Sequence, residues 1–412
     1  MNSGLWPKVG TTIPQSFTTQ PTLWNTNSSI SLCPLIQPQP DIGFFFVYRV
    51  PLNDLSRVPS IVKDHILEDV STIITSGHFL KGPFTSALEE NLSRRHAGAS
   101  VTCVGNGTDA LYLALASIGV GPGAQVATVA NAGGYTSGAT LRLGARPVMV
   151  DVDMTTAQMS VSSLEMALHM HPDIKAVVVT HLYGLVGEIE PISDLCSLRG
   201  VPLVEDCAQS FGAVVNGRPA GTFGDIATFS FYPTKNLGAF GDAGAVITSD
   251  VSLASRAASL AQYGWSHRYS VDLRNGTNSR IDEIQAAILL RLVPFLDNEN
   301  RTRRNIVLAY HEALRGERRM IHSPDSSFVG HLAVLLTDSR DTDRSTLESS
   351  GVATGIHYPV IDTDQKAWEG YIDSTDLPAT RHVQDRILTL PCFPGMTNGE
   401  IEHVVNALHG LV

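Results

Sequence analysis

Short runs of strand-forming residues alternate with helical segments in the first half of this chain. The strand-like runs lie at 101–104, 125–129, 147–152, 176–180 and 201–206, and two more follow at 226–232 and 245–248. Helical segments lie between the first five runs, at 108–118, 137–143, 161–170 and 190–198. This alternation is typical of βαβ units, in which helices cover both faces of a parallel sheet. The pattern therefore predicts an α/β fold with a mainly parallel seven-stranded sheet.

The rest of the sequence suggests three regions. Residues 1–47 are rich in Ser, Thr, Asn, Gln and Pro and lack helical periodicity, so we interpret them as a poorly ordered extension. Residues 48–295 form the predicted large domain, which begins with helices at 57–76 and 84–96. Further helices at 281–316, 341–350 and 398–409, with one strand at 330–337, indicate a smaller C-terminal α+β domain at 296–412.

Composition and charge exclude several classes of function. The net charge of −11 disfavours nucleic acid as the main partner. No apolar run reaches the length of a membrane-spanning helix, and no apolar signal segment follows Lys8, so we expect neither membrane insertion nor secretion. The five cysteines are far apart and form no Cys-x-x-Cys pair, which favours a reduced, cytoplasmic protein without a metal site.

Lys235 is the first candidate for chemistry. The strand-like run 226–232 leads directly into the glycine-rich turn that contains this lysine, and the run 245–248 leads away from it. A partly desolvated lysine loses its proton readily, which suits Schiff-base formation with an aldehyde cofactor. A surface position is the commoner interpretation for an isolated lysine, so its neighbours must decide.

A possible phosphate cradle lies at 104–111, where a strand, a glycine turn and a helix follow one another. Gly107 lets backbone amides approach an anion closely, and the helix N-terminus adds unpaired N–H groups. Thr108 contributes a hydroxyl, and Ser230, five positions before Lys235, could bind the same phosphate. Taken alone, an ordinary βα turn with a capping threonine and a polar core serine is the commoner explanation.

Three further residues follow the ends of neighbouring strands, where open α/β sheets bind their ligands. Asp206 could pair with a protonated ring nitrogen, although an isolated aspartate there is more often a helix N-cap. Gln209 could hold a phenolic oxygen of the same ring, and His181 is either catalytic or bonded to a loop carbonyl. Together with the cradle and Lys235, these groups supply what a pyridoxal-phosphate site needs.

From about residue 50 to its C-terminus the chain resembles the DegT/DnrJ/EryC1/StrS family of sugar aminotransferases. The matching segments are GNGTDAL at 105–111, VEDCAQSFGA at 204–213, FSFYPTKNLG at 229–238, GDAGAV at 241–246, NSRIDEIQAA at 278–287 and GIHYP at 355–359. This family is a branch of the fold type I pyridoxal-phosphate enzymes. The resemblance therefore implies that fold, with a large cofactor-binding domain and a smaller C-terminal domain.

The resemblance also implies roles for individual residues around the cofactor. Lys235 would carry the cofactor and move protons, Asp206 would pair with the ring nitrogen, and Gln209 would lie near the ring oxygen. The phosphate would be held by Gly107, Thr108 and Ser230. The stacking aromatic residue of the family aligns with Gly133, so either Tyr135, two positions later, stacks on the ring or another group covers it.

Other matching positions concern the partner subunit and the substrate. Asn278 matches a position that reaches the phosphate from the other subunit, which implies a homodimer with active sites at the subunit interface. His357 and Tyr358 match a segment near the substrate entrance. Diphosphate binding needs cations, and Arg280 is a candidate, although it could equally be a surface or interface residue. A histidine often found after His-Tyr-Pro is replaced here by Thr363.

The site residues predict a pyridoxal-phosphate enzyme, and the family resemblance implies an aminotransferase that moves an amino group from glutamate or glutamine to a nucleotide-linked ketosugar. An aminocyclitol aminotransferase acting on a keto-inositol is the nearest alternative. Sugar dehydratases of the family carry histidine at the Schiff-base position, so Lys235 argues against that reaction. A non-catalytic regulatory homologue is the remaining alternative, and the complete set of cofactor residues argues against it.

Overall fold

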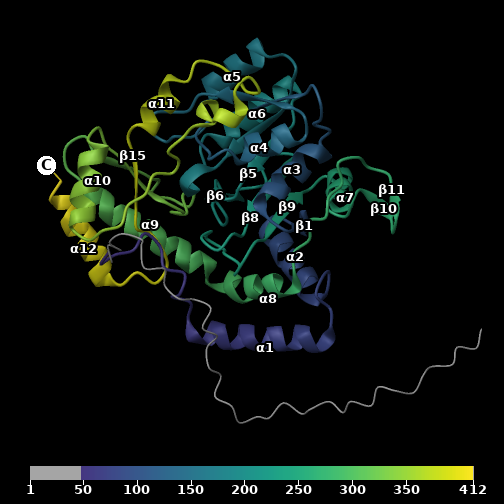
Figure 1. Ribbon diagram of the computed structural model, residues 1–412, viewed down its shortest axis with the longest axis horizontal. Helices are drawn as coiled ribbons and strands as arrows, with labels where there is room; N and C mark the ends of the chain where they lie inside the picture. Colours follow the sequence, from purple (N-terminus) through teal and green to yellow (C-terminus); the bar gives the residue numbers. More distant parts are fainter. Residues whose placement is uncertain (1–47, 412) are drawn as a thin grey trace, which may run out of the picture. The chain divides into compact units, whose positions relative to one another are not determined.

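Strands from both halves of the chain build one central sheet (Figure 1). The computed structural model describes residues 48–411, and the predicted extension 1–47 lies outside the described residues. The strands of this sheet are β1 (Ser100–Val104), β2 (Gln125–Val129), β3 (Arg146–Val150), β4 (Ile174–Thr180), β5 (Leu203–Asp206), β8 (Ile226–Ser230), β9 (Gly244–Thr248) and β14 (Asp373–Ser374). Their order is β1-β9-β8-β5-β4-β2-β3-β14.

The α/β fold class and the mainly parallel sheet are confirmed. Strand β9 runs antiparallel to both of its neighbours, β1 and β8, whereas the other neighbouring pairs are parallel. The eighth strand, β14, has two residues and was not predicted; it pairs with β3 at the edge of the sheet. Because β9 returns antiparallel to β8, the turn that carries Lys235 lies at the carboxyl end of β8.

Helices cover both faces of the sheet, and the strand residues alternate between them. On one face Val126, Val178 and Val246 pack against α3 (Gly107–Ser117), α4 (Tyr135–Arg142) and α7 (Val251–Leu260). On the other face, alternate residues such as Val177 and Val179 join the larger core. That core includes α2 (Pro83–Arg95), α5 (Val161–Met170), α6 (Ile189–Arg199) and α8 (Glu283–Leu292). Burial on both faces explains why these strands read as nearly continuous apolar runs.

Helix α1 (Ser60–Ser76) packs along α8, below it in the view of Figure 1. Its inner face places Val62 and Ile66 against Ile288. Its outer face leaves large apolar side chains exposed, namely Ile61, Leu67 and Ile74. A helix with apolar residues on two faces is unusual at a free surface, since ordinary surface helices carry a single apolar stripe.

The C-terminal part contains a three-stranded antiparallel sheet with the order β12-β13-β15. Its strands are β12 (Arg319–Ile321), β13 (Ala333–Leu336) and β15 (Ile387–Leu390). Its helices are α9 (Leu296–Ala313), α10 (Arg340–Ser349), α11 (Pro378–Gln384) and α12 (Asn398–His409). The sequence predicted β13, α10 and α12 but missed β12, β15 and α11. Thr397 and Glu400 form a capping box that starts α12.

The continuous helix predicted at 281–316 is wrong. Helix α8 ends at Leu292, a 3-10 turn at Val293–Phe295 follows, and α9 begins at Leu296. Pro294 lies within that turn, and proline has no backbone N–H with which to continue a helix. The described residues form one compact unit, so the proposed boundary between domains at 48–295 and 296–412 stays a prediction.

Short elements complete the described chain. Two-stranded hairpins are formed by β6 (Val214–Val215) with β7 (Arg218–Pro219) and by β10 (Trp265–His267) with β11 (Ser270–Val271). Further 3-10 turns lie at Leu182–Gly184, Asp362–Asp364 and Lys366–Trp368. Within residues 48–411, none of the helices combines the length and apolarity needed to span a bilayer.

Candidate active site

A cavity of about 590 Å³ opens at the carboxyl ends of β5 and β8, beside the first turn of α3. Its wall includes residues from both halves of the chain. The predicted residues that line it are Gly107, Thr108, Tyr135, Asp206, Ser230, Lys235, His357 and Tyr358. The other predicted site residues, Gln209, His181, Asn278 and Arg280, do not line this cavity.

Lys235 and Asp206 both line this cavity and are close enough to interact electrostatically. The Lys235 amide donates to the carbonyl of Tyr232 at 2.8 Å, which fixes the turn after β8. Burial lowers the pKa of the Lys235 amine to about 8, and the nearby Asp206 carboxylate opposes that shift. A lysine in this state is partly neutral near physiological pH, so it can act as a nucleophile and as a base.

Asp206 is held at the end of β5 by two donors. Its Oδ1 accepts from the amide of Ala208 at 3.1 Å, and its Oδ2 accepts from the Thr180 hydroxyl at 3.3 Å. Burial raises the pKa of Asp206, whereas these hydrogen bonds and Lys235 favour the ionised carboxylate. A buried carboxylate with few donors gains most from a cationic partner, such as a protonated ring nitrogen.

The first turn of α3 forms the expected anion cradle. Asn106 caps this helix by accepting from the amide of Asp109 at 2.8 Å. A Cβ at Gly107 would lie only 2.6 Å from the Cβ of Ser230, so this position has no room for a side chain. The backbone amides of the turn and the hydroxyls of Thr108 and Ser230 therefore share one end of the cavity. This donor set fits a phosphate group.

Gln209 lies behind the cavity wall and links two of its parts. Its Oε1 accepts from the amide of Tyr183 at 2.6 Å, and its Nε2 donates to the hydroxyl of Tyr358 at 3.2 Å. The Tyr183 hydroxyl in turn donates to the carbonyl of His357 at 2.7 Å. Gln209 thus directs an N–H toward the Tyr358 side of the cavity.

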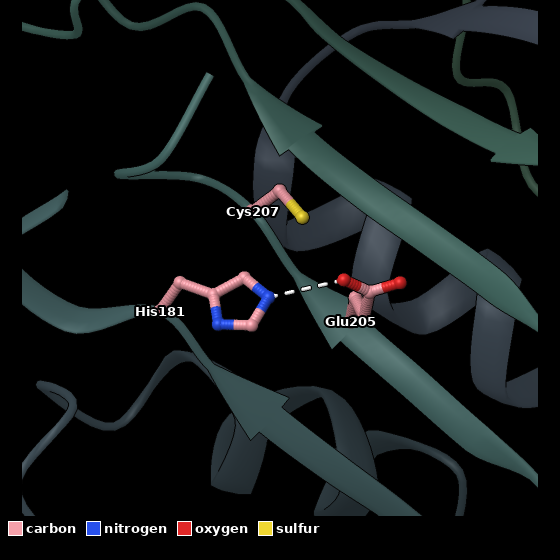
Figure 2. Close-up of side chains that lie close together, drawn as sticks. All are labelled: His181, Glu205 and Cys207. Carbon is pink, nitrogen blue, oxygen red and sulfur yellow. Dashed lines mark hydrogen bonds and ion pairs between the residues drawn. The ribbon is translucent and has the colours of Figure 1, made fainter. Parts of the chain in front are cut away.

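His181 lies away from the cavity, in a fully buried cluster with Glu205 and Cys207 (Figure 2). Its Nε2 is 3.1 Å from Oε2 of Glu205. Glu205 also accepts three backbone N–H groups of the following loop, those of Gly221, Phe223 and Gly224, at 2.6–2.8 Å. Burial would raise the pKa of Glu205, but His181 and these amides together hold it below its usual value.

The hydrogen bonds of this cluster stabilise the fold. Both carboxylate oxygens of Glu205 already have donors, so a metal ion would have to displace hydrogen bonds to bind there. Glu205 and Asp206 are consecutive in β5 and therefore point to opposite faces of the sheet. Glu205 ties β5 to the loop at 221–224, while Asp206 faces the cavity.

Tyr135 and Tyr358 lie next to each other at the cavity wall. Tyr135 is the first residue of α4 and has 49% of its surface exposed. The two rings meet edge to face, with centroids 6.2 Å apart and an interplanar angle of 77°. The Nδ1 of His357, just before Tyr358, is 2.9 Å from the Thr389 hydroxyl. Burial lowers the pKa of His357.

Asn278 and Arg280 belong to a different part of the surface. Asn278 is exposed and forms an isolated bridge with Gln262. Arg280 lies 6.0 Å from the ring centroid of Tyr263 and lines a smaller cavity of about 240 Å³ together with Glu89. Thr363, the other position singled out from the sequence, bonds to its neighbour Asp364 and does not line the main cavity.

His331 is a cavity residue that the sequence did not reveal. Its Nδ1 is 2.8 Å from Oδ1 of Asn236, the residue after Lys235. Asn236 in turn donates to Oδ1 of Asn300 at 2.7 Å and to the carbonyl of Val329 at 3.0 Å. This buried chain fixes the lysine turn against α9. The only sequence signal was a lone histidine at the start of the apolar run 330–337.

A lysine and a buried carboxylate in one cavity, an anion cradle at a helix N-terminus and this sheet order define a fold type I pyridoxal-phosphate enzyme. Residues 60–409 match the model of the DegT/DnrJ/EryC1/StrS aminotransferase family. The chain belongs to this family. It is therefore a transaminase, and pyridoxal phosphate is its cofactor.

Two relatives and one solved structure illustrate the similarity. The UDP-N-acetyl-3-dehydro-alpha-D-glucosamine 3-aminotransferase of Acidithiobacillus ferrooxidans is 35% identical, over 88% of this chain and 98% of the relative. The dTDP-3-amino-3,4,6-trideoxy-alpha-D-glucose transaminase of Micromonospora megalomicea is 36% identical, over 84% of this chain and 94% of the relative. The crystal structure of S. venezuelae DesV in complex with a ketimine intermediate has a TM-score of 0.83 at 33% identity, covering 88% and 98% of the two chains.

Proposed function

We propose that this transaminase moves an amino group from glutamate or glutamine to C3 of a nucleotide-linked 3-ketosugar. The observation that carries the reaction type is the pair of Lys235 and Asp206 in a cavity whose other end is an anion cradle. The substrate class is supported by the two relatives whose names specify nucleotide-linked sugars with an amino group at C3.

Pyridoxal phosphate, when bound, supplies an electron sink for the carbon that gains or loses the amino group. Asp206 would keep a proton on the ring nitrogen, because a buried carboxylate is stabilised by a cation beside it. Lys235 would attach the cofactor covalently and then, once free, carry a proton through its Nζ. General acid–base help of this kind contributes about 10²–10⁴-fold to a rate.

The remaining residues would bind and orient. The backbone of Gly107 and the hydroxyls of Thr108 and Ser230 would hold the phosphate, since they share one end of the cavity. The Gln209 Nε2 donates one hydrogen to the Tyr358 hydroxyl and would direct its second hydrogen to the ring oxygen. His357 and Tyr358 would meet the substrate from the C-terminal side of the cavity.

Lys235→Ala tests the central assignment. The purified wild type should show the visible absorption of a lysine-bound cofactor, and the variant should lose both that absorption and amino transfer. Lys63→Ala is a matched control, because Lys63 is an exposed lysine of α1. Full activity in Lys235→Ala would overturn the proposed function.

The substrate is tested by a panel of 3-keto and 4-keto nucleotide sugars and keto-inositols, with glutamate and glutamine as donors. A nucleotide-linked substrate predicts that the free nucleoside diphosphate competes with the sugar. Transfer to a keto-inositol without such competition would identify an aminocyclitol aminotransferase instead. Loss of a sugar hydroxyl without amino transfer would identify a dehydratase, and absence of any turnover with bound cofactor would favour a regulatory homologue.

The functional unit in this proposal is a homodimer with active sites at the subunit interface. Asn278 is exposed and lies outside the cavity of its own chain, which suits a residue that serves a second copy. The exposed apolar side chains Ile61, Leu67 and Ile74 of α1 provide a surface that a second copy would cover. Free, buried cysteines at 103, 196, 207 and 392 fit the proposed cytoplasmic location.

Mixing two inactive variants tests the shared site. In a dimer of Lys235→Ala with Asn278→Ala, one site has both intact residues and the other has neither. Random exchange therefore predicts a return to about one quarter of wild-type activity. Each variant alone should stay low, and a mixture that stays as low as its parts after complete exchange would contradict the shared site.

A further inference from the structure

Gly133 and Tyr358 form a close contact at the cavity wall. Gly133 has a φ of +79°, and a Cβ built there would lie 2.9 Å from Cε2 and 3.0 Å from Cδ2 of the Tyr358 ring. A side chain at position 133 and the present position of the Tyr358 ring therefore exclude each other. The Tyr358 ring occupies the space that the first side-chain atom of a residue at position 133 would need.

Two neighbours hold the Tyr358 ring in this place. Its hydroxyl accepts from Nε2 of Gln209 at 3.2 Å, and its edge meets the ring of Tyr135 at a centroid distance of 6.2 Å. Burial, and secondly Tyr135, raise the pKa of Tyr358, so its hydroxyl stays protonated. Tyr135 itself is far more exposed than Tyr358.

The position of the Tyr358 ring in the cavity wall suits contact with the cofactor ring. Tyr358, Ala208, Asp206 and Lys235 line the same cavity. A planar aromatic cofactor bound between Asp206 and the phosphate cradle needs an apolar surface on each face, and aromatic rings are favourable partners in stacked or edge-on geometry. Among the described residues that line the cavity, Tyr135, Tyr232 and Tyr358 are the tyrosines, and Tyr232 is exposed beside the lysine turn. The two histidines of the wall are tied to other groups, His331 to Asn236 and His357 to the Thr389 hydroxyl.

We propose that Tyr358, seated on Gly133, is the residue that covers one face of the cofactor ring, and that Tyr135 supports it from the edge. This inference rests on the proposed placement of the cofactor between Asp206, Lys235 and the cradle. It makes Tyr358 a cofactor-positioning residue contributed by the C-terminal part of the chain. The absence of a side chain at Gly133 is then the condition for this arrangement.

Cofactor affinity and circular dichroism of the bound cofactor test the proposal. Cofactor-free protein is titrated with pyridoxal phosphate, and binding is followed by visible absorption. Tyr358→Leu should raise the dissociation constant about 3- to 10-fold and reduce the visible dichroism, since an aromatic contact of typical strength is lost. Tyr358→Phe keeps the ring and should stay within about 3-fold of wild type. Tyr371→Leu, which changes an exposed tyrosine outside the cavity, is the control.

A double-mutant cycle tests the contact with Gly133 itself. Gly133→Ala should weaken cofactor binding in the wild type, because the new Cβ meets the Tyr358 ring. The same change should have a clearly smaller effect in the Tyr358→Leu background. Backbone strain at a positive φ is present in both backgrounds, so it cancels in the comparison.

Several outcomes would overturn the inference. Three results would assign the ring face to another group. Tyr358→Leu could keep wild-type cofactor affinity and dichroism, or Tyr358→Phe and Tyr358→Leu could lose equal cofactor affinity. The third is a larger loss of cofactor affinity in Tyr135→Leu than in Tyr358→Leu. Additive effects in the cycle would remove the role of Gly133. A wild-type protein without a visible cofactor band would instead contradict the proposed function, so the two failures are distinguishable.

Discussion

Replacing Asp362 by asparagine should stabilise the protein at alkaline pH and leave its stability almost unchanged at acidic pH. Asp362 is buried, with 2% of its surface exposed. Its Oδ2 accepts from the Ser137 hydroxyl. Its Oδ1 is buried and has no partner among the described residues. Burial raises the pKa of this carboxyl to about 7, although the Ser137 hydroxyl and the Gly134 amide favour its ionised form.

The sign and size of the effect follow from the two pKa values. The carboxyl titrates near 3.8 in the unfolded chain and near 7 in the folded protein, so the folded state binds the proton more tightly. The loss of folding stability caused by ionised Asp362 is therefore absent below about pH 4, grows as the pH rises, and is complete above about pH 7. The difference of about three units between the folded and unfolded pKa values corresponds to about 4 kcal/mol, which is an upper bound for the destabilisation by ionised Asp362.

Urea unfolding at pH 5, 6, 7 and 8, followed by far-ultraviolet circular dichroism, measures this effect. The midpoint of Asp362→Asn should exceed that of the wild type at pH 8, and the difference should shrink steadily toward pH 5. Asp364→Asn is the matched control, because the exposed pair of Asp364 with Arg381 lowers the pKa of its carboxyl and contributes little. A difference for Asp362→Asn that is constant with pH, or that favours the wild type increasingly toward pH 8, would refute the reasoning.

Three further predictions concern the lysine turn and the core behind it. The rate at which pyridoxal phosphate attaches to cofactor-free protein should rise with pH and reach half its maximum near pH 8, because only the neutral Lys235 amine attacks. Stopped-flow absorption measures this rate, and a rate independent of pH from 6 to 10 would contradict the prediction. Glu205→Ala should lower the free energy of unfolding by about 3–5 kcal/mol, since several buried donors lose their acceptor. A decrease below about 1 kcal/mol in urea unfolding would show that Glu205 does not stabilise the loop at 221–224. His331→Leu should slow single-turnover amino transfer about 10- to 100-fold, because Asn236 loses its hydrogen bond to His331. An unchanged rate would show that His331 is not needed to position the turn that carries Lys235.

The central sheet was predictable from the sequence because its strands carry a strong local signal. Runs such as 176–179 and 245–247 are buried on both faces and consist only of apolar residues. β12 and β15 are short, and β14 has two residues, so their pairing depends on contacts with distant segments. No local composition can show such contacts. The break at Pro294 could have been inferred from proline chemistry alone.

The site divides in the same way. Lys235, Asp206, Thr108 and Ser230 stand at strand ends or helix starts, and the fold brings these positions to one edge of the sheet. The contact of Gly133 with Tyr358 joins residues 225 positions apart, and its steric consequence exists only in three dimensions. The sequence did show that position 133 lacked an aromatic residue, which marked the place where the structure had to supply something else.

The cavity wall has a consequence for synthesis on the ribosome. The wall begins at Leu52 and is completed by Thr389, Leu390 and Cys392, close to the end of the chain. Lys235 therefore lacks part of its C-terminal wall until residues 389–392 have been synthesised. The complete cavity can form only when synthesis of this chain is almost finished.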